Sequence, residues 1–77
     1  MSTKRIEINP RILMGKPVIK GTRISVSLIL NLLSQGYTIE KIIEAYPKLT
    51  KKDVISAIKY AQQRLNREIV RPLPISK

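Results

Sequence analysis

The fold is decided between residues 38 and 54, which read TIEKIIEAYPKLTKKDV. Thr38 is a residue type that caps helix N-termini, and Pro47 disfavours helical backbone at the residue before it. A short helix of about two turns is therefore predicted over residues 39–46. Its apolar positions follow the i, i+3, i+4, i+7 spacing of one helical face. They are Ile39, Ile42, Ile43 and Tyr46.

The same stretch contains a second helix start. Thr50 and Asp53 have the spacing of a capping motif, and an acid in the first turn suits the helix dipole. A third, longer helix is predicted over residues 51–66, with one dry side and one polar side. The dry side is expected to carry Val54, Ile58, Ala61 and Leu65, and the polar side Lys52, Ser56, Lys59, Tyr60 and Gln63.

The chain before this stretch predicts a hydrophobic helix preceded by short strands. Ser25 is a candidate N-cap and Gly36 follows the last helical residue, which frames a helix over residues 26–35. Apolar residues cover more than one of its faces, so it is either central or shared with a second subunit. Residues 6–8, 17–20 and 22–24 have the alternation of short extended segments around Gly21.

These elements predict a mainly α protein, a trihelical helix-turn-helix bundle with short N-terminal β-strands. One domain is expected over residues 1–66. Residues 67–77 contain two prolines and alternating apolar residues, which favour an extended C-terminal tail. The length of 77 residues allows a single core, and self-association would add stability to so small a domain.

The charge of the chain favours a polyanionic partner. Fifteen lysines and arginines against five acidic residues give a formal net charge of +10. A basic surface that only improves solubility is the alternative. The hydrophobic content of 43% separates the chain from a disordered basic tail.

The composition argues against catalysis. The chain has no histidine and no cysteine, so metal sites and nucleophilic pairs lack their usual ligands and bases. Glu40 and Glu44 share a helix face but read as a solvated surface, and the glycines do not have the spacing of a phosphate-binding loop. We expect a protein that is not an enzyme and needs no metal or cofactor.

No segment predicts membrane insertion or export. Residues 24–33 form the longest apolar-rich stretch and are too few to span a bilayer, and residues 1–8 alternate charge with isoleucine. The absence of cysteine fits a reducing compartment. The protein is therefore expected in the cytoplasm, with no membrane partner.

The predicted third helix carries the candidate DNA contacts. In a helix-turn-helix domain the last helix enters the major groove, where its outward side chains meet base edges and basic residues hold phosphates. The turn at residues 47–49 lacks the usual glycine, and the polar side lacks arginine and asparagine, so modest sequence specificity is expected. The candidate residues are Lys51, Lys52, Ser56, Lys59, Tyr60 and Gln63.

The chain also resembles a known family. The run GKPVIKGTRI at residues 15–24 is distinctive, and it is followed by LLSQGYT at 32–38, IIEAYP at 42–47, Leu49-Thr50, Asp53-Val54 and AIKYA at 57–61. With these segments the chain resembles the family called domain of unknown function 433 over about residues 6–61.

The resemblance implies a homeodomain-like helical fold with a small N-terminal β element. It also implies an antitoxin role beside a ribonuclease toxin of the PIN-like kind. Within the distinctive run, Gly15, Pro17, Gly21 and Thr22 are expected to build the turn scaffold. Arg23 is the best candidate in that run for a phosphate contact.

Two functional hypotheses follow. The first is a transcriptional regulator and antitoxin that binds duplex DNA as a homodimer, joined through its N-terminal strands or through Leu28 and Leu32. The second is a protein-interaction module whose tail blocks a PIN-like toxin without specific DNA binding. Its tail contacts would be Arg67, Ile69, Val70, Arg71, Leu73 and Ile75. RNA binding ranks lower because only three tyrosines could stack on bases.

Overall fold

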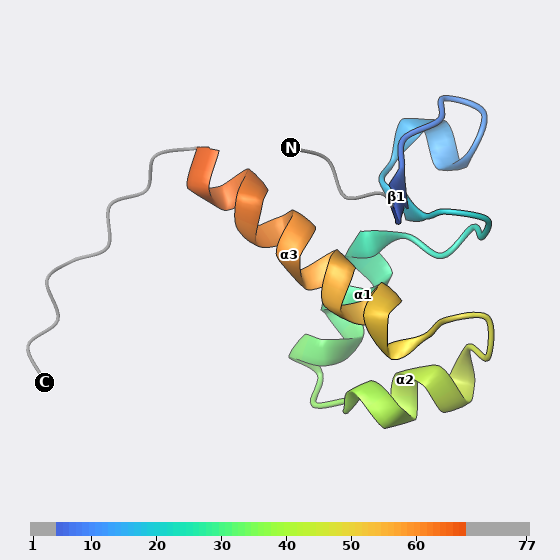
Figure 1. Cartoon of the computed structure of the whole chain (residues 1–77), viewed down its shortest axis with the longest axis vertical. Helices are drawn as coiled ribbons and strands as arrows, with labels where there is room; N and C mark the ends of the chain where they lie inside the picture. The colour runs from blue at the N-terminus through green and yellow to red at the C-terminus, as the bar shows by residue number, and fades with distance from the viewer. Residues whose placement is uncertain (1–4, 68–77) are drawn as a thin grey trace, which may run out of the picture.

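The computed structural model describes residues 5–67 and contains three helices and a two-stranded sheet (Figure 1). The mainly α class with short N-terminal strands is therefore confirmed. In chain order the elements are β1 (Ile6–Glu7), the 3-10 turn η1 (Leu13–Gly15), β2 (Val18–Ile19), α1 (Val26–Ser34), α2 (Ile39–Ala45) and α3 (Lys51–Arg67).

The predicted caps set the helix boundaries. The Ser25 hydroxyl accepts a hydrogen bond from the Leu28 N–H at 3.0 Å, and the Thr38 hydroxyl accepts one from the Lys41 N–H at 3.1 Å. Gly36 follows α1 with a φ of 98°, a left-handed conformation that suits glycine. Both helices end one residue before the predicted position, since Gln35 and Tyr46 leave helical geometry as C-caps.

The N-terminal strands form a small antiparallel hairpin. Ile6 of β1 lies opposite Ile19 of β2, and Glu7 lies opposite Val18. The chain then turns back at residues 20–23, and the Ile19 N–H donates to the Ile24 carbonyl at 2.9 Å. This turn delivers the chain directly to the start of α1.

The core lies where the three helices meet the hairpin. α3 packs against α1, α2 and β1. Leu49, in the connection between α2 and α3, is buried in this core. The buried apolar residues are Val18, Ile19, Val26, Ile29, Ile42, Leu49, Val54 and Ala57.

The dry side of α3 is rotated from the predicted one. Val54 and Ala57 are buried, whereas Ile58 is 39% exposed and Leu65 is 60% exposed. The prediction that Ile58 and Leu65 belong to the dry side is wrong. The core instead meets the side of α3 that carries Asp53, Val54, Ala57 and Tyr60, and Asp53 is held there by hydrogen bonds from the Thr50 N–H and from Arg5.

No helix within residues 5–67 has both the length and the apolar character needed to cross a bilayer.

Candidate nucleic-acid interface

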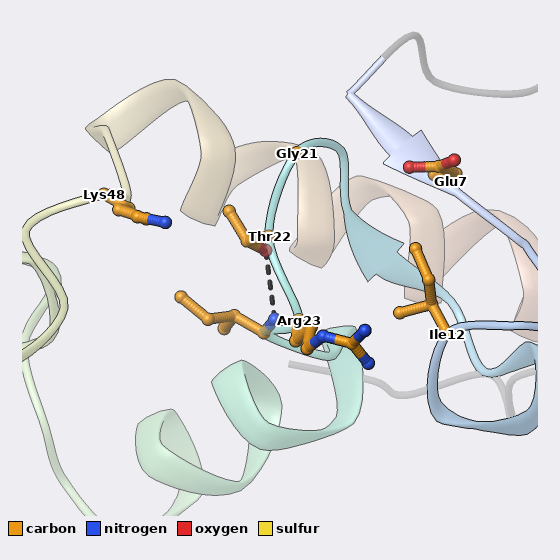
Figure 2. Close-up of a pocket in the computed structure, with 7 residues that line it drawn as sticks. Glu7, Ile12, Gly21, Thr22, Arg23 and Lys48 are labelled. Atoms are coloured by element: carbon orange, nitrogen blue, oxygen red, sulfur yellow. Dashed lines mark hydrogen bonds between the residues drawn. The ribbon is translucent and has the colours of Figure 1, made fainter.

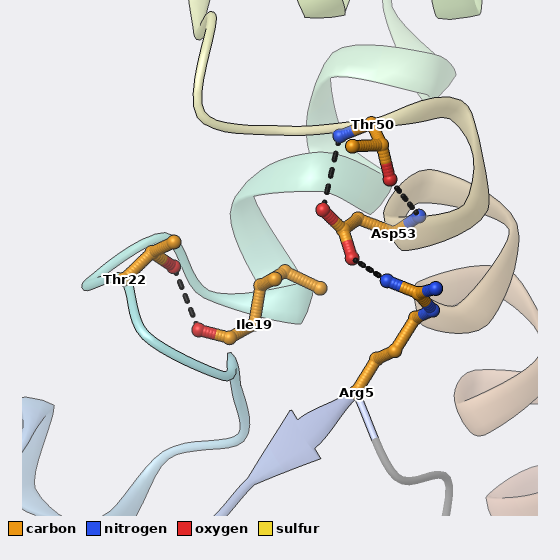
Figure 3. Close-up of polar contacts among 5 residues, drawn as sticks. All are labelled: Arg5, Ile19, Thr22, Thr50 and Asp53. Atoms are coloured by element: carbon orange, nitrogen blue, oxygen red, sulfur yellow. Dashed lines mark hydrogen bonds and ion pairs between the residues drawn. The ribbon is translucent and has the colours of Figure 1, made fainter.

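The N-terminus of α3 is fixed by a buried carboxylate. Asp53 accepts a hydrogen bond from the Thr50 N–H at 2.9 Å, while the Thr50 hydroxyl accepts one from the Asp53 N–H at 3.2 Å. This is the reciprocal capping predicted from the sequence. Arg5, just before β1, donates to the second carboxylate oxygen at 3.1 Å (Figure 3). The start of α3 is thereby held against the hairpin.

One part of the solvent-facing surface of α3 is polar and cationic, while Ile55, Ile58 and Leu65 are exposed on another part. Lys51, Lys52, Lys59 and Gln63 are exposed, and Ser56 is half-buried at the margin of the same side. We call Lys52, Ser56, Lys59 and Gln63 the polar side of α3. Asp53 is the only acidic residue of this helix, and its charge faces inward to Arg5. The described part of α3 therefore presents positive charge to solvent without an exposed acid.

Tyr60 does not join the polar side. Its ring packs against the hydrophobic core, and the Arg64 guanidinium lies 5.9 Å from the ring centroid. Sequence steps of about 100° place Tyr60 beside Gln63, yet the rotation of α3 turns its ring toward the body of the domain. Four of the six predicted α3 residues therefore form the polar side, and Lys51 is exposed in the first turn of the helix.

A hollow of about 530 Å³ lies beside the connection between α2 and α3. Figure 2 shows Lys48 extending from that connection toward Thr22, while Arg23 extends toward Ile12. Glu7 lies on the β1 side of the view, away from Lys48. We call this the Arg23–Lys48 hollow. It is lined by Glu7, Ile12, Gly21, Thr22, Arg23, Ile24 and Lys48.

The turn that carries Arg23 is built by its neighbours. The Thr22 hydroxyl donates to the Ile19 carbonyl at 2.7 Å and accepts from the Ile24 N–H at 3.0 Å. Gly21 has a φ of 81°, which a side chain would disfavour. Gly21 and Thr22 therefore form the turn, and the exposed Arg23 is positioned by it.

Lys48 is a candidate that the sequence interpretation missed. It is exposed and lies two residues before Thr50, in the short connection that precedes the third helix. Its position between the two helices was the available signal.

The other predicted interaction residues are placed as follows. The two surfaces predicted for the homodimer are the N-terminal strands and the pair Leu28 and Leu32. β1 pairs with β2 of the same chain, and Leu28 and Leu32 are half-buried in the single chain. Arg67 is the last residue of α3, one residue beyond the predicted end of the helix. The remaining predicted tail contacts lie outside the described residues; they are Ile69, Val70, Arg71, Leu73 and Ile75.

Within residues 5–67, no three acidic, histidine or cysteine side chains gather in a way that could hold a metal ion. The acids of that range are Glu7, Glu40, Glu44 and Asp53. Glu40 and Glu44 are exposed on α2 and Asp53 is engaged by Arg5, so Glu7 is the acid that lines the Arg23–Lys48 hollow, together with the cations Arg23 and Lys48.

Fold and surface together define a small three-helix domain with an N-terminal β-hairpin. The chain belongs to the family described as protein of unknown function (DUF433), whose model matches residues 6–61. A crystal structure of a DUF433 member from Anabaena variabilis is similar, with a TM-score of 0.74 and 31% identity. The match covers 87% of this chain and 69% of that one.

A curated relative gives a second comparison. The chain is 35% identical over 54 residues to the uncharacterized protein y4eO of Sinorhizobium fredii. The match includes 70% of this chain and 24% of that protein. The chain therefore spans about a quarter of this relative's length.

Proposed function

We propose that this protein is a DNA-binding regulator in which α3 enters the major groove of duplex DNA. The observation that carries the proposal is the two-sided character of α3. Val54 and Ala57 are buried in the core, while the polar side faces solvent with cationic and amide groups. α2 and α3 follow each other across a short connection, the arrangement used by helix-turn-helix domains.

Base contacts would come from the polar side of α3. Gln63 can pair with adenine through its amide, and Lys52 and Lys59 can donate to guanine. Ser56 has a hydroxyl that suits either base or phosphate. Without an arginine on this side, discrimination among sequences rests on few bidentate contacts.

Phosphate contacts would come from the cations around the start of α3. Lys51 is exposed in its first turn, Lys48 lies in the preceding connection, and Arg23 lines the same hollow as Lys48. These groups would fix the orientation of the domain on the duplex.

Binding of a fluorescently labelled random-sequence duplex, followed by anisotropy at several salt concentrations, tests the proposal. We expect the logarithm of the affinity to fall linearly with the logarithm of the salt concentration. The triple variant K52A/K59A/Q63A should weaken binding strongly, whereas K41A, on α2, should not. Equal binding by the triple variant and the wild-type chain would refute the proposal.

We further propose that the DNA-bound form is a homodimer. Two copies related by a twofold axis would place their α3 helices in successive major grooves, about 34 Å apart. Leu28 and Leu32, half-buried in the single chain, offer one surface for the contact. Sedimentation at micromolar concentration in the presence of duplex would show two chains per site, and a single chain per site would contradict the homodimer.

An antitoxin role is the biological setting that we propose for this regulator. The support is the resemblance of the chain to its family together with the proposed DNA-binding surface on α3. In that setting the tail would neutralise a PIN-like ribonuclease. Deletion of residues 68–77 should abolish neutralisation and leave duplex binding intact. Loss of both properties would refute this division of labour.

A further inference from the structure

The connection between β1 and β2 carries the most exposed apolar side chain among the large hydrophobic residues of positions 5–65. Met14 is 93% exposed and its neighbour Leu13 is 40% exposed. We call these two residues the apolar tip. Single exposed hydrophobic residues are common, but an adjacent pair at the end of a hairpin is a feature that needs an explanation.

The backbone holds the apolar tip outward in an unusual conformation. Leu13 and Met14 have φ values of 49° and 58°, followed by Gly15 at 87°. Residues other than glycine, asparagine and aspartate rarely adopt this left-handed backbone conformation. Hydrogen bonds fix it nevertheless, from the Gly15 N–H to the Ile12 carbonyl at 3.0 Å and from the Lys16 N–H to the Leu13 carbonyl at 3.2 Å.

The base of the loop is equally well ordered. The Ile12 N–H donates to the Asn9 carbonyl at 2.8 Å, and the Arg11 N–H donates to the Asn9 side chain at 2.9 Å. Pro10 restricts the backbone between them. The apolar tip is therefore presented on a turn with its own hydrogen bonds.

The surroundings of the tip are cationic and adjoin the proposed DNA surface. Arg11 and Lys16, on either side of it in the chain, are exposed. Ile12, directly before Leu13, lines the same hollow as Arg23 and Lys48. The hollow therefore separates the base of the tip from the connection that leads into α3.

We propose that the apolar tip is a wedge that enters the minor groove of the duplex next to the major groove occupied by α3. This inference rests on the proposed function. DNA-bending proteins insert leucine or methionine between base steps, which unstacks them and kinks the duplex. A phosphate strand crossing the Arg23–Lys48 hollow would separate the two grooves, and Arg11 and Lys16 would hold phosphates beside the tip.

An exposed apolar tip could also contact a second copy of the chain or a lipid bilayer. The charges beside the tip favour duplex DNA over both. The proposed homodimer joins its two copies through Leu28 and Leu32, away from the tip, and a copy seated on the tip would meet the exposed cations Arg11 and Lys16. A bilayer would receive only two side chains, which bury less apolar surface than the single acyl chain that gives marginal membrane binding. Duplex DNA offers phosphates to Arg11 and Lys16 and a base step to the apolar tip.

The test measures protein-induced bending of a duplex of about 30 base pairs with central TA steps, which kink easily. Donor and acceptor dyes at its two ends report the end-to-end distance. The variant M14N keeps a residue type that tolerates left-handed backbone and removes the apolar side chain. The matched control is L65N, which makes the same change at an exposed position of α3 outside the polar side.

We expect the wild-type chain and L65N to shorten the end-to-end distance, and M14N to leave the duplex straight with about tenfold weaker binding. The salt dependence of binding should not change, because no charge is removed. A second variant, M14G, removes the side chain and suits the left-handed backbone, so its loss of bending together with an unchanged circular dichroism spectrum excludes misfolding as the cause.

Bending by M14N and M14G equal to that of the wild-type chain would overturn the wedge while leaving the proposed function intact. Loss of self-association or of binding to anionic phosphatidylserine vesicles in M14N, with bending retained, would also overturn it and assign the tip to a second copy or to a membrane. Failure of the wild-type chain to bind any duplex would refute the proposed function, and the wedge with it.

Discussion

The Arg5 guanidinium and the Asp53 carboxylate lie 3.1 Å apart although 48 residues separate them in the chain. Asp53 is nearly buried, and its other oxygen accepts the Thr50 N–H. The contact therefore joins the residue before β1 to the first turn of α3. It couples the hairpin, which carries the apolar tip, to the helix that carries the polar side.

Loss of this contact should destabilise the whole domain. We expect R5A to lower the free energy of unfolding by about 1 kcal/mol, because Arg5 is partly exposed and Asp53 keeps its Thr50 partner. D53A should cost about 2 kcal/mol, since the helix cap is lost as well. Urea denaturation followed by circular dichroism measures both values.

The double variant R5A/D53A separates the ion pair from the cap. Its cost should be smaller than the sum of the two single costs by about 1 kcal/mol, because the pair can be lost only once. Strict additivity would show that Arg5 contributes nothing through Asp53.

The turn that positions Arg23 should depend on one hydroxyl. T22V keeps the side-chain shape but removes both the donor to Ile19 and the acceptor for Ile24. We expect a loss of stability of about 1 to 2 kcal/mol, with T22S close to the wild-type chain because it retains the hydroxyl. If thermal melting finds T22V as stable as T22S, the two hydrogen bonds do not hold the turn.

The cations of the Arg23–Lys48 hollow should act on DNA affinity through phosphate alone. R23A and K48A should each reduce the slope of log affinity against log salt by about 1 and weaken binding to all sequences alike. K41A is the control, since Lys41 lies on α2 outside the hollow. A slope that K48A leaves unchanged would remove Lys48 from the interface.

Gln63 should act on sequence preference instead. Q63A removes an uncharged amide, so the salt slope should stay constant while discrimination at one base pair falls by about 1 to 3 kcal/mol. Binding to a library of duplexes, sequenced before and after selection, measures the preference. An unchanged preference in Q63A would mean that the amide does not contact a base.

The left-handed turn at Met14 should carry a measurable conformational cost. M14G should raise the free energy of unfolding by about 0.5 to 1 kcal/mol. Glycine adopts a φ of 58° without a steric penalty, and this gain is only partly offset by the greater backbone freedom that glycine loses on folding. L65G also replaces an exposed apolar side chain by glycine, but within the right-handed helix α3, and should lower stability by about 1 kcal/mol. Destabilisation by M14G would contradict the strain inferred for this turn.

Local signals in the sequence determined the secondary structure. Ser25, Thr38 and Thr50 start helices because their hydroxyls accept bonds from backbone N–H groups one turn ahead, and Pro47 lies in the connection that separates α2 from α3. Such signals act within about four residues, so they are legible without knowledge of the fold. The spacing of isoleucines likewise identified Ile42 as buried.

Only the tertiary structure decided how these elements face one another. The helical wheel placed Ile58 and Leu65 inside with Val54, but the folded domain buries Ala57 and Asp53 beside Val54 and leaves Ile58 and Leu65 exposed. Asp53 meets Arg5 there, a residue from the other end of the described chain. The hollow between Arg23 and Lys48 likewise joins segments 25 residues apart. Contacts across such separations depend on the packing of the whole chain, because no local preference of the backbone specifies them.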